Sequence, residues 1–136
     1  MLHKISVLFG TLIIGVISQP VMAHEEILAE FNNEARVANP AFRGFSATQG
    51  ETFFRQKHGG EWACVSCHTD NPAASGKHAK TGKIIQPLAP AANPERFTNP
   101  AKVAKWFKRN CNDVLGRACS AQEKGDVLSY LLAIKN

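Results

Sequence analysis

A regular spacing of apolar side chains predicts a first helix directly after Phe45. The segment "ATQGETFFRQK" places Gly50 and Phe54 four residues apart, so both lie on one face of a helix. Ser46 or Thr48 can cap its N-terminus, because a hydroxyl oxygen there accepts a hydrogen bond from a free backbone N–H. We therefore expect a short amphipathic helix whose apolar face carries a bare glycine.

The C-terminal segment carries the most complete helix signature in the chain. Ser120 and Glu123 form an S-x-x-E capping box, in which each side chain accepts a hydrogen bond from the other residue's backbone N–H. The apolar residues that follow recur at helical spacing: Val127, Leu128, Leu131 and Ile134. Because Gly50 has no side chain, a second backbone can approach it closely. We expect the two helices to cross where Gly50 meets the Tyr130–Leu131 region.

A further helix is predicted between these two. It begins near Thr98 or Asn99, since Pro100 suits the first helical position, and it runs through "AKVAKWFKRN" to Asn110. Its apolar face carries Val103, Trp106 and Phe107. Its polar face is mostly basic and carries Lys102, Lys105, Lys108 and Arg109.

The segment between Asn71 and Asn99 is rich in proline and has no regular periodicity. Its prolines are Pro72, Pro87, Pro90 and Pro94, with Pro100 at the far edge. This composition is typical of an extended loop, and no segment of the chain has the pattern of a strand of useful length. The chain is therefore predicted to be a small all-α domain of short helices and long loops. A domain of this size is marginally stable by itself.

The first residues of the chain have a pattern of their own. A short basic start, "MLHK", precedes the apolar run "ISVLFGTLIIGVI", and "VMA" offers small residues before a cleavage site. This is typical of a secretory signal peptide cleaved after Ala23; the alternative is an uncleaved membrane anchor, because the run is at the lower limit for spanning a bilayer. We expect residues 1–23 to be removed, residues 24–44 to form an N-terminal extension and residues 45–136 to form the domain.

Charge adds little to this picture. The chain has 16 lysines and arginines against 11 acidic residues, a formal net charge of +5. The basic residues are spread among glutamates and do not form the clusters of a nucleic-acid-binding protein. We expect a monomer with no nucleic-acid partner and, once the signal peptide is removed, no membrane partner.

The motif "CVSCH" indicates the chemistry of the domain. Cys64 and Cys67 are spaced so that both thiols can form thioethers with one haem, and His68 can then bind the iron as proximal ligand. A thioredoxin-like redox pair is an alternative, but the chain lacks the alternation of strands and helices of that fold. Zinc bound with Cys111 or Cys119 is another, and export to an oxidising compartment disfavours it. We predict one covalently attached haem c.

The second axial ligand cannot be methionine in the exported chain. Both methionines, Met1 and Met22, leave with the predicted signal peptide. Three histidines could serve instead: His24 at the mature N-terminus, where we expect it to be mobile, His58, which is too close to the haem motif to reach the far face easily, and His78 in the long loop. A lysine or an open position also remains.

Asn110 has two interpretations from the residues alone. It is expected to end its helix at a distance from His68 that lets the chain return to the far side of the haem, so it can be the distal ligand. It can equally be a helix C-cap, a common place for asparagine. The adjacent Cys111 can pair with Cys119, as two spare cysteines usually do in an exported protein, and the pair would fix this helix end.

From Phe45 to the C-terminus the chain resembles the sphaeroides haem protein (SHP) family of monohaem cytochromes c. The resemblance rests on "CVSCHTDNPAASGKHAKTGKIIQPLAP", "NPERFTNPAKVAKWFKRNCNDVLG" and "RACSAQEKGDVLSYL". Its most specific part is the asparagine–cysteine pair followed by a second cysteine. The resemblance implies a class I cytochrome c fold wrapped around one covalently bound haem. It also implies roles for particular residues: Cys64, Cys67 and His68 as the haem site, Asn110 as distal ligand and Cys111–Cys119 as a disulfide.

The resemblance further implies an iron that binds small diatomic ligands when reduced, and a dihaem cytochrome as electron partner. The chemistry agrees, because an amide oxygen is a weak, hard donor that suits ferric iron better than ferrous iron. Reduction should therefore loosen Asn110 and open a site for O₂ or NO. We predict a periplasmic electron-accepting haem protein of this kind, not an enzyme. The alternative is a simple periplasmic electron-transfer cytochrome c without a gas ligand. In either case we expect Lys105, Lys108 and Arg109 to speed association with an acidic redox partner.

Overall fold

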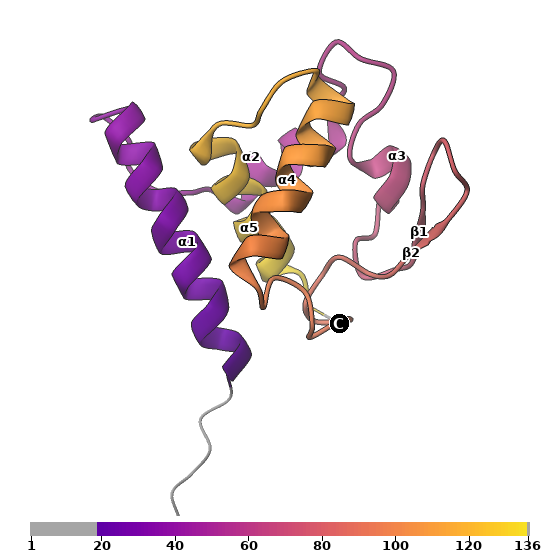
Figure 1. Ribbon diagram of the computed structural model, residues 1–136, viewed down its shortest axis with the longest axis horizontal. Coiled ribbons are helices and arrows are strands. Elements are labelled where there is room, and N and C mark those ends of the chain that lie inside the picture. The colour runs from indigo at the N-terminus through magenta and orange to yellow at the C-terminus, as the bar shows by residue number, and fades with distance from the viewer. Residues whose placement is uncertain (1–18, 136) are drawn as a thin grey trace, which may run out of the picture.

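The computed structural model describes residues 19–135, which fold into helices and one short hairpin (Figure 1). The predicted signal peptide therefore lies mostly outside the described residues. The elements follow one another in the order α1 (Gln19–Ala38), α2 (Ala47–Arg55), α3 (Val65–His68), β1 (Gly76–Lys77), β2 (Ile84–Ile85), α4 (Pro100–Leu115) and α5 (Ala121–Ala133). None of the described helices is long and apolar enough to cross a membrane.

Helices α2 and α5 cross at Gly50, where α2 has no side chain. A side chain at Gly50 would collide with the backbone carbonyl of Asp126 on α5, whereas Gly125 of α5 packs against the ring of Phe45. The predicted crossing of the two helices is confirmed, but its predicted position at Tyr130–Leu131 is wrong by about one helical turn. The missing side chain at Gly50 allows the closest approach one turn earlier, at Asp126, and Tyr130 instead packs against the ring of Phe54.

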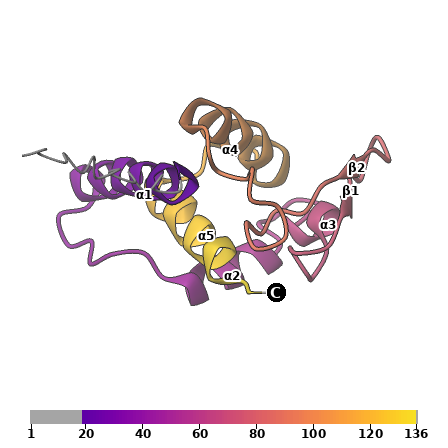
Figure 2. The same cartoon turned by 90° about the horizontal axis from the view of Figure 1, so that it is seen from below.

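The core consists of two neighbouring clusters of buried side chains. The first joins α1, α4 and α5 and contains Ile27, Phe31, Val103 and Leu128. The second joins α2 to α5 and contains Phe54, Val127, Tyr130 and Leu131. Helix α5 contributes to both clusters and so forms the centre of the fold, between α1 and α2 in the second view (Figure 2).

Helix α1 was not predicted, although the segment 24–44 belongs to the core. Ile27, Phe31 and Ala35 recur every four residues and are all nearly inaccessible to solvent. His24 is not mobile as expected, because its Nε2 lies 2.9 Å from the carbonyl oxygen of Arg96. The predicted cleavage site after Ala23 falls within the first turns of α1, so cleavage there would leave the buried part of the helix in place.

Helix α4 begins as predicted and ends later than predicted. The side chain of Asn99 caps it by accepting a hydrogen bond from the backbone of Lys102, with Pro100 in the first turn. Asn110 does not end the helix, which continues to Leu115 and closes at Gly116 in the left-handed conformation with φ of 69°. The prediction failed because the apolar face continues past Asn110.

The long loop carries one feature that its composition did not reveal. Strands β1 and β2 pair as an antiparallel hairpin in which Gly76 lies opposite Ile85 and Lys77 opposite Ile84. In both views the hairpin extends beyond α3, at the end of the molecule far from α1 (Figures 1 and 2). The predicted capping box of α5 is confirmed, since Ser120 and Glu123 each accept the other's backbone N–H.

Candidate haem site

The haem motif forms a single turn of helix, α3, preceded by Cys64. Cys64 and Cys67 are both half-buried and unpaired, and the backbone N–H groups of Cys67 and His68 donate to the Cys64 carbonyl. This turn brings the two thiols and the imidazole together within five residues. The turn ends at Thr69, whose φ of 63° redirects the chain.

Side chains of α2 hold this turn in place. Arg55 donates to the carboxylate of Asp70 at 2.8 Å and to the Asp70 carbonyl at 3.1 Å, so α2 is tied to the residues that follow His68. The ring of Phe54, which is 2% exposed, lies 6.2 Å from the ring of His68. The second core cluster therefore reaches directly to the predicted proximal ligand.

Burial favours the uncharged forms of the Cys64 thiol and the His68 imidazole. Burial raises the pKa of the Cys64 thiol to about 11, whereas a redox-active thiol needs a lowered pKa. Burial, with smaller contributions from Arg96 and His78, lowers the pKa of His68 to about 4. At neutral pH the His68 imidazole is uncharged, which is the form that binds a metal.

The zinc alternative does not fit the arrangement of the remaining cysteines. Cys111 and Cys119 are joined by a disulfide with their Cα atoms 5.6 Å apart, which confirms the predicted pairing. Neither is free to join Cys64 and Cys67 around a metal. Among residues 19–135 no cluster of three or more histidine, cysteine or acidic side chains could hold a metal ion by itself.

Asn110 lies on the solvent-exposed side of α4, immediately before the buried Cys111. The C-cap interpretation of Asn110 is excluded, because Gly116 ends the helix. Its side-chain amide makes no hydrogen bond to any of the described residues. The helix therefore fixes the backbone of Asn110, while its side-chain amide is exposed and has no partner among the described residues.

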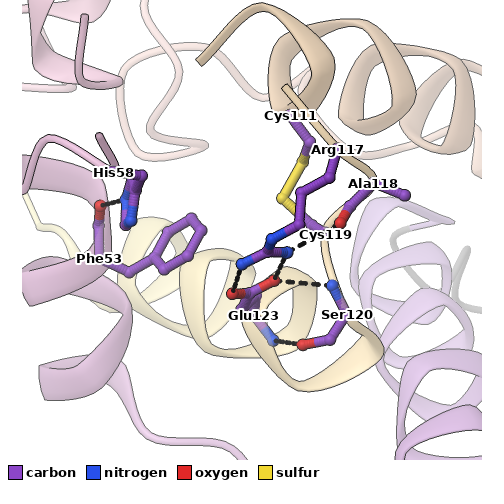
Figure 3. Close-up of a disulfide and its surroundings, with 8 residues drawn as sticks. All are labelled: Phe53, His58, Cys111, Arg117, Ala118, Cys119, Ser120 and Glu123. Atoms are coloured by element: carbon purple, nitrogen blue, oxygen red, sulfur yellow. Dashed lines mark hydrogen bonds and ion pairs between the residues drawn. A yellow bond between two sulfur atoms is a disulfide. The ribbon is translucent and has the colours of Figure 1, made fainter. Parts of the chain in front are cut away.

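The disulfide anchors the C-terminal part of α4 to the start of α5 (Figure 3). Arg117 lies between its two cysteines and donates to both carboxylate oxygens of Glu123, at 2.7 and 2.9 Å. The same carboxylate accepts the backbone N–H of Ser120 at 2.7 Å. Disulfide, ion pair and capping box therefore fix the helix that carries Asn110 from its C-terminal side.

The three histidines considered as distal ligands are all engaged elsewhere. His24 binds the Arg96 carbonyl, as described above. His58 places Nε2 2.9 Å from the Phe53 carbonyl oxygen and stacks on the Phe53 ring at 4.2 Å. His78 accepts two backbone N–H groups of its own hairpin at its Nδ1 atom, both at 3.3 Å.

Comparison with known proteins now decides the family. Residues 40–131 match the family described as a domain of unknown function, DUF1924. Cytochrome c'' of Methylophilus methylotrophus is 43% identical over 135 residues, which span 96% of this chain and 94% of that protein. The chain belongs to the SHP/cytochrome c'' family. The SHP cytochrome of Cereibacter sphaeroides is 49% identical over 71 residues, 52% of this chain and 54% of the relative.

Solved structures of this family have the same fold. The oxidised crystal structure of cytochrome c'' covers 85% of this chain and 98% of its own, with 43% identity and a TM-score of 0.75. Oxidised SHP, described as an oxygen-binding cytochrome c, covers 82% of this chain and 96% of its own, with 36% identity and a TM-score of 0.73. These matches confirm the predicted cytochrome c-like all-α fold and the resemblance to SHP.

Haem c is the cofactor of the SHP/cytochrome c'' family, and the residues of this chain fit it. Cys64 and Cys67 offer two unpaired thiols, and the ring of His68 makes no hydrogen bond among the described residues. The apolar side chains of Val65, Leu88 and Phe97 extend the second core cluster toward Cys64. This donor set and its apolar surroundings are those that a covalently attached haem requires.

Proposed function

We propose that this chain is an exported c-type cytochrome whose iron is held by His68 and, when oxidised, by Asn110. Cys64 and Cys67 attach the haem. The main support for the proposal is the amide of Asn110, which is exposed on α4, makes no hydrogen bond to the described residues, and precedes the buried Cys111 of the disulfide. An amide on a fixed helical backbone and without a protein partner is free to bind a group that is not protein.

The haem supplies a redox-active iron with two axial positions. His68 offers a neutral imidazole in a half-buried, partly apolar environment, which is a ligand for either oxidation state. Asn110 offers a neutral amide oxygen, a hard donor that favours the ferric state. Reduction should therefore release Asn110 and leave its position open to a small diatomic ligand such as O₂ or NO.

Two relatives support this interpretation. SHP is described as an oxygen-binding cytochrome c. The solution structure of cytochrome c'' is 44% identical to this chain and covers 85% of this chain and 97% of its own, with a TM-score of 0.76. It is described as giving insight into haem-ligand detachment. These two descriptions support ligand release and oxygen binding as the proposed behaviour of this chain, with Asn110 as the proposed ligand that is released.

The proposed function includes a redox partner protein and a compartment. We propose that the partner is a dihaem cytochrome c, as the family resemblance implies, and that both proteins are periplasmic. The signature of a signal peptide in residues 1–23 and the Cys111–Cys119 disulfide support export to an oxidising compartment.

The test is the substitution Asn110→Val with Asn112→Val as the matched control. Both asparagines are exposed on α4, and only the backbone of Asn112 takes part in the helix end. We expect Asn110→Val to keep its haem, to change the ferric absorption spectrum and to bind NO in the ferric state faster than the wild type. Asn112→Val should match the wild type in all three measurements. If the Asn110→Val spectrum equalled that of the wild type, Asn110 would not be a ligand, and a simple electron carrier would be the better description.

A further inference from the structure

The hairpin formed by residues 76–85 presents a basic surface that the proposed function does not use. It carries Lys77, Lys80 and Lys83, and all three side chains are exposed. No acidic residue occurs between Asp70 and Glu95 to balance them. Ile84 lies opposite Lys77 across the hairpin and is 66% exposed, which adds an apolar side chain to the charged surface.

The hairpin holds these lysines in a defined arrangement. The backbone of His78 donates to the Lys83 carbonyl at 2.8 Å, and Gly82 donates to the His78 carbonyl at the same distance. The ammonium group of Lys80 lies 4.7 Å from the centre of the Trp62 ring, a cation–π contact that restrains it. A charged surface that is ordered in advance loses less entropy when a partner binds.

The same hairpin contacts the haem-attachment turn. The backbone N–H of Ala79 donates to the sulfur of Cys67 at 3.3 Å. Gly76 packs so closely on the Cys67 carbonyl that a side chain at Gly76 would clash with it. The lysine surface is therefore connected to one of the two attachment sulfurs through a single hydrogen bond.

We propose that the lysine hairpin, residues 76–85, is the docking surface for an acidic redox protein and that electrons cross beside Cys67. This inference rests on the proposed function, because it requires a haem attached at Cys67. Three exposed lysines on one hairpin, without an acidic residue among them, favour a partner with a cluster of carboxylates, and the exposed Ile84 offers an apolar contact beside them. A partner seated there lies next to the attachment turn, whereas helix α4 lies on a different part of the molecule (Figures 1 and 2). The inference therefore replaces the expectation from the sequence that Lys105, Lys108 and Arg109 of α4 form the docking surface.

The experiment compares two charge reversals of equal size in the holoprotein. One variant changes the hairpin: Lys77→Glu, Lys80→Glu and Lys83→Glu. The control changes three exposed lysines of α4: Lys102→Glu, Lys105→Glu and Lys108→Glu. The acidic partner is represented by an electrode coated with a carboxylate-terminated monolayer at low ionic strength. A double variant, Lys77→Glu with Lys83→Glu, keeps the contact between Lys80 and Trp62 in case the triple variant does not mature.

The hairpin variants should adsorb poorly and exchange electrons with the monolayer at least about tenfold more slowly than the wild type, because charge complementarity changes association by about 10- to 1,000-fold. The α4 control should stay within about threefold of the wild type, and higher salt should remove the difference between them. Reduction potentials of all variants are measured in solution with small mediators, and electrode rates are compared at each variant's own potential. If electron exchange slowed in the α4 variant as much as in the hairpin variant, or more, the docking surface would be on α4 and the inference would be wrong.

Two further outcomes separate the causes of failure. If the wild type showed no reversible redox signal with mediators in solution, the proposed function itself would fail. If the wild type bound vesicles of phosphatidylglycerol, the hairpin variant did not, and electrode kinetics were equal for both, the hairpin would be a lipid-binding surface and the inference would be wrong.

Discussion

Replacing Gly50 with alanine should destabilise the protein, because it forces α2 away from α5. A Cβ atom at Gly50 would lie 2.8 Å from the backbone nitrogen of Val127 and closer still to the Asp126 carbonyl, whereas ordinary contacts of a Cβ atom are 3.4–4 Å. Clearing the Val127 nitrogen alone therefore needs a separation of about 0.6 Å, and clearing the closer Asp126 carbonyl needs more. A gap of roughly 0.5–1 Å already removes a quarter to a half of the dispersion energy between facing atoms.

The interface that would open is the second core cluster. Phe54 and Leu131 are each 2% exposed and Val127 is 6% exposed. Burial of side chains of this size contributes about 1.5–3 kcal/mol each, so partial loss at three of them amounts to about 2–3 kcal/mol. The higher helix propensity of alanine offsets up to about 1 kcal/mol of this loss. We expect a net loss of about 2 kcal/mol, which corresponds to roughly 8 °C in the unfolding midpoint of a domain of this size.

The assay is guanidinium unfolding of the holoprotein, followed by far-ultraviolet circular dichroism. Thr48→Ala is the control, since it creates the same residue on the exposed side of α2 and should change the free energy of unfolding by less than about 0.5 kcal/mol. If the Gly50→Ala variant were as stable as the wild type, the backbones of α2 and α5 would not be in direct contact at Gly50 and Asp126.

Three further predictions concern the elements around this interface. Phe31→Ala should lower the free energy of unfolding by about 3 kcal/mol in a denaturant titration, because the side chain is 3% exposed and a core phenylalanine leaves a cavity; a loss under 1 kcal/mol would mean that α1 is not part of the core. Replacing Cys111 and Cys119 by serine should cost about 2–3 kcal/mol in the same titration, since the loop they close is short; unchanged stability would contradict the role of the disulfide. Hydrogen bonds from Arg117 lower the pKa of Glu123, so the carboxylate stabilises the fold above its unfolded-state pKa and loses this effect as the pH falls through its lower folded-state pKa. Glu123→Gln should therefore be less stable than the wild type at pH 7 and equal to it in strongly acid solution, and a difference that persisted in acid would contradict the ion pair.

The features that were predicted from the sequence are local patterns. The motif at Cys64–His68 fixes its chemistry by the spacing of three side chains, and the capping box at Ser120 forms between residues three apart. Both depend on neighbours along the chain, so both can be identified without knowing the fold. The disulfide also belongs here, because its two cysteines are only eight residues apart.

The features that were missed depend on contacts between distant segments. Helix α1 packs through Phe31 onto a ring of α4, with the two ring centres 5.7 Å apart, and nothing next to Phe31 in the sequence indicates this contact. Its spacing of Ile27, Phe31 and Ala35 was a usable signal, but the segment follows the predicted signal peptide and was treated as an extension. The end of α4 was misplaced because Cys111 continues the apolar face beyond Asn110.

The lysine hairpin was missed for a different reason. Its strands have two residues each, which is too short for any alternation of polar and apolar residues to be visible. What positions the hairpin is the contact of Gly76 and Ala79 with Cys67, which lies about ten residues earlier in the chain. The regular spacing of Lys77, Lys80 and Lys83 was present in the sequence, but without the hairpin it had no structural meaning.

The proposed release of Asn110 on reduction is tested most directly by the rate at which CO binds to the dithionite-reduced wild type as the CO concentration is raised. If Asn110 leaves the iron on reduction, no protein ligand has to dissociate before CO enters. We predict a five-coordinate ferrous absorption spectrum and an observed rate that rises in proportion to CO concentration without a plateau. A six-coordinate ferrous spectrum, with a rate that levels off at high CO, would show that an internal ligand remains bound and would contradict the account.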